Sequence, residues 1–212
     1  MIISVSGPIG SGKDTIAQII QEITPYHKWE IQKWAGKLKT IGELISGIPK
    51  EKFEDQEFKY TNLPAMWDKD GEPMTVRDLL QLLGTEAMRN GLHENVWVNA
   101  LMSEYKGYHK KEKQISLVDT SFDENTYPNW IITDTRFPNE LDAVKFRNGI
   151  SIKVHRPGSK SDAKQAQHAS ETALNNVTDW DYVISNDGDI DELRNKVYEV
   201  LEAERLLVFA SQ

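Results

Sequence analysis

The glycine-rich segment Gly-Pro-Ile-Gly-Ser-Gly-Lys-Asp at residues 7–14 has the composition of a phosphate-binding loop. Glycines let successive backbone N–H groups turn toward phosphate oxygens, and the lysine adds a positive charge beside them. An apolar run at residues 2–5 precedes the segment and an apolar-periodic stretch at 16–20 follows it, as between a strand and a helix. The pattern predicts that the chain binds a nucleoside triphosphate. The alternative is a strand-to-helix turn that binds no nucleotide.

One position departs from the usual form of this loop. A Ser or Thr normally follows the lysine, and its hydroxyl holds Mg²⁺. Here Asp14 follows Lys13, and a hydroxyl comes only one residue later, at Thr15. The residues alone therefore leave open how the loop would hold a metal ion.

Polar residues also follow three other apolar runs of the chain. Asp134 and Arg136 follow the expected strand at 130–133. Arg156 follows the expected strand at 150–155, and Asn186 follows the one at 182–184. In open parallel sheets, ligands bind beyond the carboxyl ends of the strands. We therefore expect these residues to converge on the glycine-rich loop.

The chemistry of these residues suits a phosphate site, although each has a simpler alternative. Asp134 could hold Mg²⁺ directly or through water, or accept a proton, but an Asp after a strand often only caps a turn. Arg136 and Arg156 carry planar, permanently charged groups that match phosphate oxygens, and phosphoryl transfer chiefly needs such positioning and neutralisation. The alternative for each arginine is an ion pair in solvent.

A second polar group lies on the expected helix between Arg77 and Arg89. Gln81, Thr85 and Glu86 recur there at helical spacing beside an apolar stripe, and residues four apart share a face. With an arginine near each end, that face could bind a nucleotide base and phosphate. The residues alone favour the alternative, a solvated helix side.

A third group carries less chemistry. His168 stands near Ser170 and Glu171, but no nucleophile elbow or metal-spaced partner accompanies it. A polar lid or a helix cap is the preferred interpretation.

Strand-like and helix-like segments alternate along the chain, which predicts an α/β fold with an open, mainly parallel sheet and helices on both faces. Expected strands lie at 2–5, 28–34, 130–133, 150–155 and 182–184, with a further short apolar piece at 115–118. Expected helices follow the loop as far as Thr24 and then lie at 35–45, 75–83, 95–104, 138–148 and 190–206.

Length and composition bound the organisation. The 212 residues suffice for one α/β domain and are too few for two ordinary ones, so we predict a single domain over 1–212. Segments 46–73 and 105–129 lose the periodic pattern and are predicted to be insertions, which serve as lids or binding loops or as plain elaboration. The polar stretch 156–172 is a predicted lid.

Charge and residue usage exclude several classes. A net charge of −8 argues against a broad nucleic-acid-binding surface, so any anion site must be a local basic pocket. The sequence has no cysteine, which removes disulfides and thiol catalysis. It shows neither a signal peptide nor an apolar stretch long enough to span a membrane. We expect a soluble cytoplasmic protein that binds small molecules.

Six motifs in order together resemble the deoxynucleoside monophosphate kinases of tailed bacteriophages. They are Gly-x-x-x-x-Gly-Lys-Asp-Thr at 7–15, Arg77-x-x-Leu80-Gln81-x-Leu83-Gly84-Thr85, Trp97-Val98, Asp134-Thr135-Arg136, His155-Arg156-Pro157-Gly158 and Asp181-x-Val183-Ile184-x-Asn186-Asp187-Gly188. The resemblance covers nearly the whole chain. It also accounts for Asp14, because a Lys-Asp-Thr ending of the loop is what that family shows.

The resemblance implies a three-layer P-loop kinase fold with lid and acceptor-binding insertions. The implied reaction transfers the γ-phosphoryl of ATP to a deoxynucleoside 5′-monophosphate, with Mg²⁺ bridging the donor phosphates, in phage nucleotide metabolism within the host cytoplasm. On the donor side the implied residues are Gly10, Ser11, Gly12, Lys13, Asp14 and Thr15, with Asn186 and Gly188 at adenine and Arg156 beginning a lid. The implied metal residues, direct or through water, are Asp14, Thr15 and Asp134.

On the acceptor side, the resemblance implies that the monophosphate and its base are held by Lys37, Arg77, Gln81, Thr85, Arg89, Trp97 and Arg136. The residues implied nearest the transfer itself are Lys13, Asp134, Arg136 and Arg156. No general base is assigned, because the acceptor phosphate oxygen is already ionised at neutral pH. The family also allows a homodimer through the apolar faces of helices in 75–104.

Two alternatives stay open at this point. One is a kinase for another small phosphorylated acceptor, such as dephospho-coenzyme A or phosphomevalonate. The other is a P-loop ATPase or regulatory module, which would hydrolyse ATP without any monophosphate.

Overall fold

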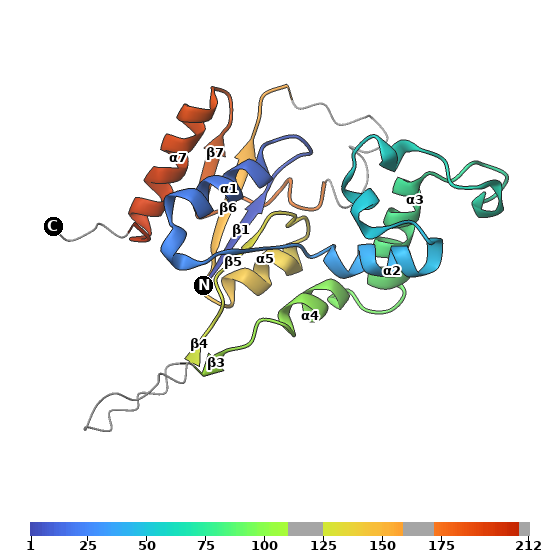
Figure 1. Cartoon of the computed structure of the whole chain (residues 1–212), viewed down its shortest axis with the longest axis horizontal. Helices are drawn as coiled ribbons and strands as arrows, with labels where there is room; N and C mark the ends of the chain where they lie inside the picture. Colours follow the sequence, from blue (N-terminus) through green and yellow to red (C-terminus); the bar gives the residue numbers. More distant parts are fainter. Residues whose placement is uncertain (110–124, 159–171, 208–212) are drawn as a thin grey trace. The chain divides into compact units, whose positions relative to one another are not determined.

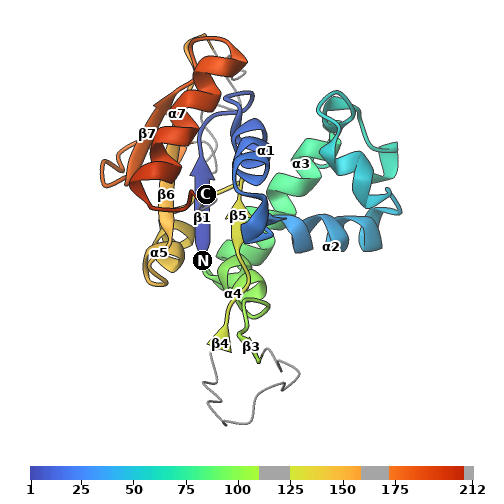
Figure 2. The same cartoon turned by 60° about the vertical axis from the view of Figure 1, so that its left-hand side comes forward.

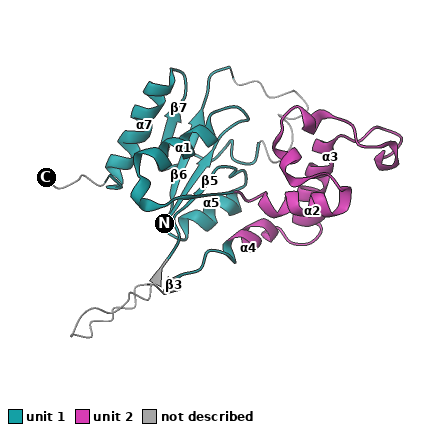
Figure 3. Ribbon diagram, viewed as in Figure 1, with its two compact units in different colours: residues 1–32, 102–212 teal, residues 33–101 magenta. Residues whose placement is uncertain are grey.

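The computed structural model describes residues 1–109, 125–158 and 172–207 (Figure 1). The chain divides into two compact units, which are coloured separately in Figure 3. Unit 1 comprises residues 1–32 and 102–212, and unit 2 comprises residues 33–101.

Unit 1 is built on a five-stranded sheet. Its strands are β1 (Ile2–Ser6), β2 (Glu30–Gln32), β5 (Trp130–Ile132), β6 (Ile150–His155) and β7 (Tyr182–Ser185). They lie in the order β2-β5-β1-β6-β7, and every neighbouring pair is parallel. The central strand β1 is buried along its whole length, as expected for a parallel sheet covered on both faces.

Helices α1 (Lys13–Ile23), α5 (Pro138–Lys145) and α7 (Ile190–Ala203) pack on this sheet (Figure 2). Helices α1 and α7 share one apolar core with Ile3 and Val5 of β1. The β1–α1–β2 and β5–α5–β6 connections cross the sheet in opposite directions, and right-handed crossovers then place α1 and α5 on opposite faces. The predicted α/β fold with a parallel sheet between helices is confirmed.

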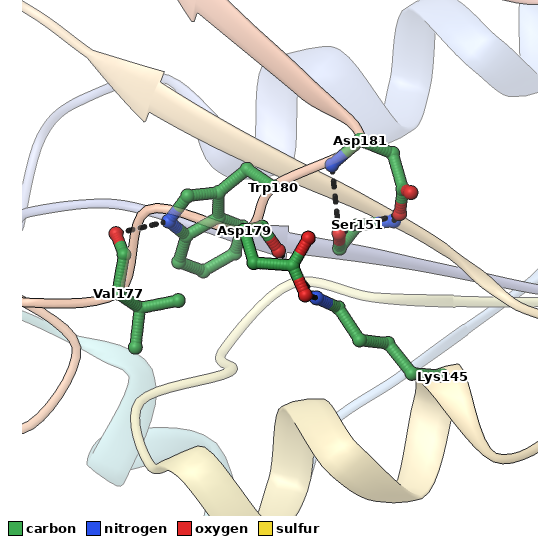
Figure 4. Close-up of polar contacts among 6 residues, drawn as sticks. All are labelled: Lys145, Ser151, Val177, Asp179, Trp180 and Asp181. Atoms are coloured by element: carbon green, nitrogen blue, oxygen red, sulfur yellow. Dashed lines mark hydrogen bonds and ion pairs between the residues drawn. The ribbon is translucent and has the colours of Figure 1, made fainter.

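Strand β7 is locked in register where it begins (Figure 4). The Asp181 carboxylate accepts hydrogen bonds from the backbone N–H of Ser151 (2.8 Å) and from its Oγ (2.6 Å), and the Asp181 N–H donates back to that Oγ (3.1 Å). Lys145 pairs with Asp179 beside it. Asp181, the first residue of the Asp181-x-Val-Ile motif, thus stabilises the pairing of β6 with β7.

The predicted insertion 105–129 begins and ends in an antiparallel ribbon of β3 (Tyr108–His109) and β4 (Asn125–Thr126). Tyr105 stacks on Tyr127 with 5.3 Å between ring centroids and meets Trp130 edge-on at 4.9 Å. These rings tie the ribbon to the sheet. The expected strand at 115–118 lies outside the described residues.

Unit 2 is helical. It contains α2 (Gly36–Ser46), the short helices η2 (Lys50–Glu54), η3 (Phe58–Tyr60) and η4 (Ala65–Trp67), α3 (Val76–Gln81), the π-helix η5 (Leu82–Asn90) and most of α4 (Val96–Met102). Phe53 is fully buried and packs with Leu63, Val76 and Leu79 in a small core. Segment 46–73 therefore contributes to a core of its own rather than only covering a surface.

Within the described ranges, no helix combines the length and apolar character needed to cross a lipid bilayer.

Candidate active site

The loop between β1 and α1 has the backbone conformation that its glycines predict. Gly10 (φ 75°) and Gly12 (φ 101°) are both in the left-handed region, which other residues adopt only at a cost. A Cβ on Gly12 would also lie 2.5 Å from Nδ2 of Asn186. Glycine at position 12 is thus required by torsion and by space.

Two side chains of the loop bear on the predicted phosphate site. The Lys13 ammonium folds back over the loop and donates to the carbonyl oxygens of Gly7 (2.8 Å) and Pro8 (2.7 Å). Ser11 is fully buried, and in the part of the chain that the structure describes its Oγ has no hydrogen-bond partner. A buried hydroxyl without a partner is costly, and an oxygen of a bound phosphate would supply one.

The carboxyl ends of three further strands contact the loop or the start of α1. After β5, Thr133 donates its hydroxyl to the Asp14 carboxylate (2.8 Å). After β6, Arg156 donates to the carbonyl oxygen of Gly10 (3.3 Å). After β7, Asn186 donates its amide to the carbonyl oxygen of Ser11 (2.8 Å). The structure therefore brings Arg156 and Asn186 to the loop, as predicted from their positions at the carboxyl ends of parallel strands.

Asp134 and Arg136 lie on a segment that is held firmly against β1. The hydroxyls of Thr135 and Ser4 share a hydrogen bond of 2.7 Å, and Ser6 donates to the Thr135 carbonyl oxygen, also at 2.7 Å. Downstream, the buried Glu140 carboxylate accepts from the backbone N–H groups of Arg136 (2.8 Å) and Phe137 (3.1 Å). The backbone that carries Asp134 and Arg136 is fixed on both sides.

The turn that carries Asn186 is braced from α7. Lys196 donates to the carbonyl oxygen of Ser185 (2.7 Å) and to the Asp187 carboxylate (2.9 Å). The Lys196 hydrogen bond lowers the pKa of the exposed Asp187 carboxyl. Gly188 follows directly, before α7 begins. This brace keeps Asn186 in reach of the loop.

In unit 2, the polar helix face predicted between Arg77 and Arg89 is divided between the interior and the solvent. Thr85 and Arg89 are buried and Gln81 is half-buried, whereas Glu86 is exposed and accepts from Asn90 (2.9 Å). The solvated-side alternative fits Glu86 and does not fit Thr85 or Arg89.

The helix changes its winding within this motif. A capping box at Thr75 and Asp78 starts α3, which continues from Gln81 into the π-helix η5. Trp97 of α4 is buried, and its indole N–H donates to the carbonyl oxygen of Gly84 inside η5 (2.9 Å). Wide π-helical turns are rare and concentrate at functional sites. The sequence analysis expected regular α-helical spacing here and did not predict the π-helix.

The other predicted residues have simpler positions. Lys37 is exposed in the first turn of α2, and Arg77 of α3 lies over the Tyr60 ring at 5.9 Å. Arg89 donates to the carbonyl oxygen of Glu94 (2.9 Å). Thr15 is half-buried in the first turn of α1. His168, Ser170, Glu171 and most of the predicted lid at 156–172 lie outside the described residues.

A parallel sheet whose central strand leads through such a loop into a helix, with arginine and asparagine from neighbouring strand ends on the loop, defines a P-loop nucleotide-binding protein. Residues 41–197 match the family described as deoxynucleotide monophosphate kinase. The chain belongs to this family, as the order of its motifs predicts, and it is therefore an enzyme that transfers a phosphoryl group.

Individual relatives agree with the family. A protein of Acanthamoeba polyphaga mimivirus with the provisional name deoxynucleotide monophosphate kinase is 27% identical over 210 residues, covering 95% of this chain and 96% of the relative. The deoxynucleotide monophosphate kinase of Enterobacteria phage T4 is 31% identical over 128 residues, covering 60% of this chain and 46% of the relative. Among solved structures, shikimate kinase from Aquifex aeolicus aligns over 97% of this chain and 99% of its own, with 12% identity and a TM-score of 0.47.

Proposed function

We propose that the chain transfers the γ-phosphoryl group of ATP to deoxynucleoside 5′-monophosphates, giving ADP and deoxynucleoside diphosphates. The observation that carries this proposal is the family match together with the glycine loop that Arg156 and Asn186 contact. Family membership favours this reaction over the two alternatives, a kinase for another phosphorylated acceptor and an ATPase module.

The loop residues fit a triphosphate. Among the described residues the buried Ser11 hydroxyl has no hydrogen-bond partner, and apart from the chain neighbours of Gly10 no atom lies within 4 Å of the position that a Cβ on Gly10 would take. We assign the donor phosphates to residues 10–15, with Lys13 and Arg156 neutralising their charge. Lys13 needs only to exchange the Gly7 and Pro8 carbonyl oxygens for phosphate oxygens, because its ammonium already lies over the loop.

A divalent cation held at this site would supply positive charge that offsets the negative charge of the phosphates. Carboxylate and hydroxyl oxygens are ligands that it accepts, and one or two carboxylates with substrate phosphates usually suffice. Asp14, Thr15 and Asp134 supply that set here, directly or through water.

Asn186 combines two roles in this proposal. One N–H of its amide donates to the Ser11 carbonyl oxygen, and we assign contact with adenine to its Oδ1 atom and to the turn at Gly188. Because an amide oxygen accepts hydrogen bonds, it suits the exocyclic amino group of adenine.

For the monophosphate and its base, we propose the residues Lys37, Arg77, Gln81, Thr85, Arg89, Trp97 and Arg136. The acceptor oxygen is ionised at neutral pH, so these side chains align it and offset its charge and need not remove a proton. The proposed partners are nucleotides alone. A homodimer and a place in the host cytoplasm remain predictions.

The test is ADP formation from ATP and Mg²⁺, measured without acceptor and then with each of dAMP, dGMP, dCMP and dTMP. The four ribonucleotides and dephospho-coenzyme A are the comparison acceptors. We expect strong stimulation by at least one deoxynucleotide and little ADP without acceptor. ADP release that is independent of acceptor, or stimulation by dephospho-coenzyme A alone, would overturn the proposal.

A further inference from the structure

The Asp14 carboxylate is held from a distant part of the chain. Oγ1 of Thr133 donates to Oδ1 of Asp14 at 2.8 Å, although 119 positions separate the two residues. Asp14 lies in the exposed first turn of α1, whereas Thr133 is only 2% exposed and directly follows β5. The bond therefore links a solvent-facing acid to the interior of the sheet.

Thr133 is a rigid donor. Its own N–H donates to the carbonyl oxygen of Gln32 in β2 (3.4 Å), which extends the pairing of β5 by one residue. Two positions later the hydroxyl of Thr135 is fixed on Ser4 of β1. Because sheet neighbours hold the backbone on both sides, the Thr133 hydroxyl has a defined position from which to orient Asp14.

A carboxylate at this place needs such a donor, whereas the usual hydroxyl does not. The Ser or Thr of an ordinary P-loop places its oxygen directly on Cβ, but the Asp oxygens lie one bond further and turn about an additional torsion. An ionised carboxylate only accepts hydrogen bonds, so another group must fix that torsion. Its two oxygens offer about four lone-pair sites, so the carboxylate can accept from Thr133 and also contact a cation.

We propose that Thr133 is a positioning residue that orients Asp14 toward the divalent cation that accompanies ATP. The inference rests on the proposed function of Asp14 at the donor phosphates. Groups that hydrogen-bond to metal ligands typically change metal affinity or activity by 10–100-fold when they are removed.

The direct test measures metal affinity without turnover. Mn²⁺ serves as the probe, and its binding to the ADP-loaded enzyme is followed by the loss of the free-Mn²⁺ electron paramagnetic resonance signal. We expect Thr133→Val to weaken Mn²⁺ binding about tenfold, while Thr133→Ser, which keeps the hydroxyl, restores wild-type affinity. Binding of ADP without metal should not change.

Thr24→Val is the matched control. Thr24 is likewise buried, and its hydroxyl donates to Ile20 and accepts from Trp29, away from the loop. This variant should lower thermal stability without moving Mn²⁺ affinity. Equal Mn²⁺ affinities for the Thr133→Val and Thr24→Val variants would overturn the inference.

A double-mutant cycle shows whether Thr133 acts through Asp14. In an Asp14→Asn background, Thr133→Val should have no further effect on Mn²⁺ affinity, because the carboxylate it orients is gone. A full tenfold loss in that background would contradict the proposal. If the wild-type enzyme binds Mn²⁺ with ADP but phosphorylates no monophosphate, only the proposed reaction is overturned. The double-mutant cycle would still test the role of Thr133.

Discussion

The phosphate loop of unit 1 and the π-helix of unit 2 are both candidate nucleotide-binding regions, but they are built differently. The loop gets its shape from backbone torsions at Gly10 and Gly12, which a short local sequence specifies. The π-helix contains a contact from another helix, because the indole N–H of Trp97 donates to the carbonyl oxygen of Gly84. A backbone-defined site can be read from one motif, whereas a site defined by side chains depends on tertiary packing.

The largest expected effect tests the loop. Lys13→Ala should reduce turnover by roughly 10²–10³-fold, because one charged donor to the transferring group is lost, while circular dichroism and melting temperature stay near wild type. Coupled ADP assays measure the change. Lys106→Ala, at an exposed lysine outside the site, is the control, and undiminished turnover in the Lys13→Ala variant would remove the loop from catalysis.

Arg136 tests the separation of donor and acceptor roles. Arg136→Ala should raise KM for the deoxynucleotide about tenfold or more while KM for ATP changes little, because the proposed contact with the acceptor phosphate would be lost. Arg136→Lys keeps the positive charge but not the planar guanidinium group, so its KM for the deoxynucleotide should lie between those of the wild type and Arg136→Ala. Equal increases in both KM values would place Arg136 outside the acceptor site.

Trp97 tests whether the π-helix shapes the acceptor residues. Trp97→Phe removes the indole N–H from Gly84 and should lower the free energy of unfolding by about 1 kcal/mol, with a rise in the acceptor KM. Trp180→Phe is the matched control, since that indole N–H donates to the Val177 carbonyl oxygen, also at 2.9 Å (Figure 4). Urea unfolding should show a smaller stability loss in the control, where the indole is only half-buried, and steady-state kinetics should show no acceptor effect there. Matching kinetics in both variants would limit Trp97 to folding.

The smallest effect concerns the ion pairs that attach η2 to α2. Burial raises the pKa of the Glu54 carboxyl, but the hydrogen bond and charge of Lys39, with Lys33 nearby, outweigh it and hold the pKa below the usual 4.5. The stabilisation is therefore present above pH 4.5 and is lost as the pH falls through the lowered pKa.

Because the Glu54 side chain is half exposed, its contribution should stay below about 1 kcal/mol. Glu54→Gln should reduce the pH dependence of the free energy of unfolding, measured by urea unfolding between pH 6 and 3. Parallel profiles for wild type and variant would assign the acid sensitivity to other carboxyls.

The strands of the sheet could be predicted from the sequence, because buried parallel strands consist of short runs of apolar residues. The positions of Arg156 and Asn186 followed from the rule for strand ends. The expected strand 28–34 is shorter in the structure, at Glu30–Gln32, because Lys33 already forms a turn with Gly36 that leads into α2.

Side-chain tertiary contacts were not predictable in the same way. Phe53 lies among charged residues in a short 3₁₀ turn, so its complete burial has no periodic signal. The π-helix was missed because its apolar residues also fit an α-helix, and its partner Trp97 comes from another helix. Thr133 looked like an ordinary strand residue, since nothing local indicates that its hydroxyl reaches Asp14.

The close approach of Asn186 to Gly12 has a consequence for evolution. Any side chain at position 12 would occupy the space of the Asn186 amide, so position 12 cannot change while Asn186 keeps its place. Lineages that keep this asparagine must keep glycine at position 12, and those that lose it must find another donor for the Ser11 carbonyl oxygen. Among homologues, glycine at position 12 should therefore persist even where position 186 has become small, because its φ of 101° favours glycine independently of the space.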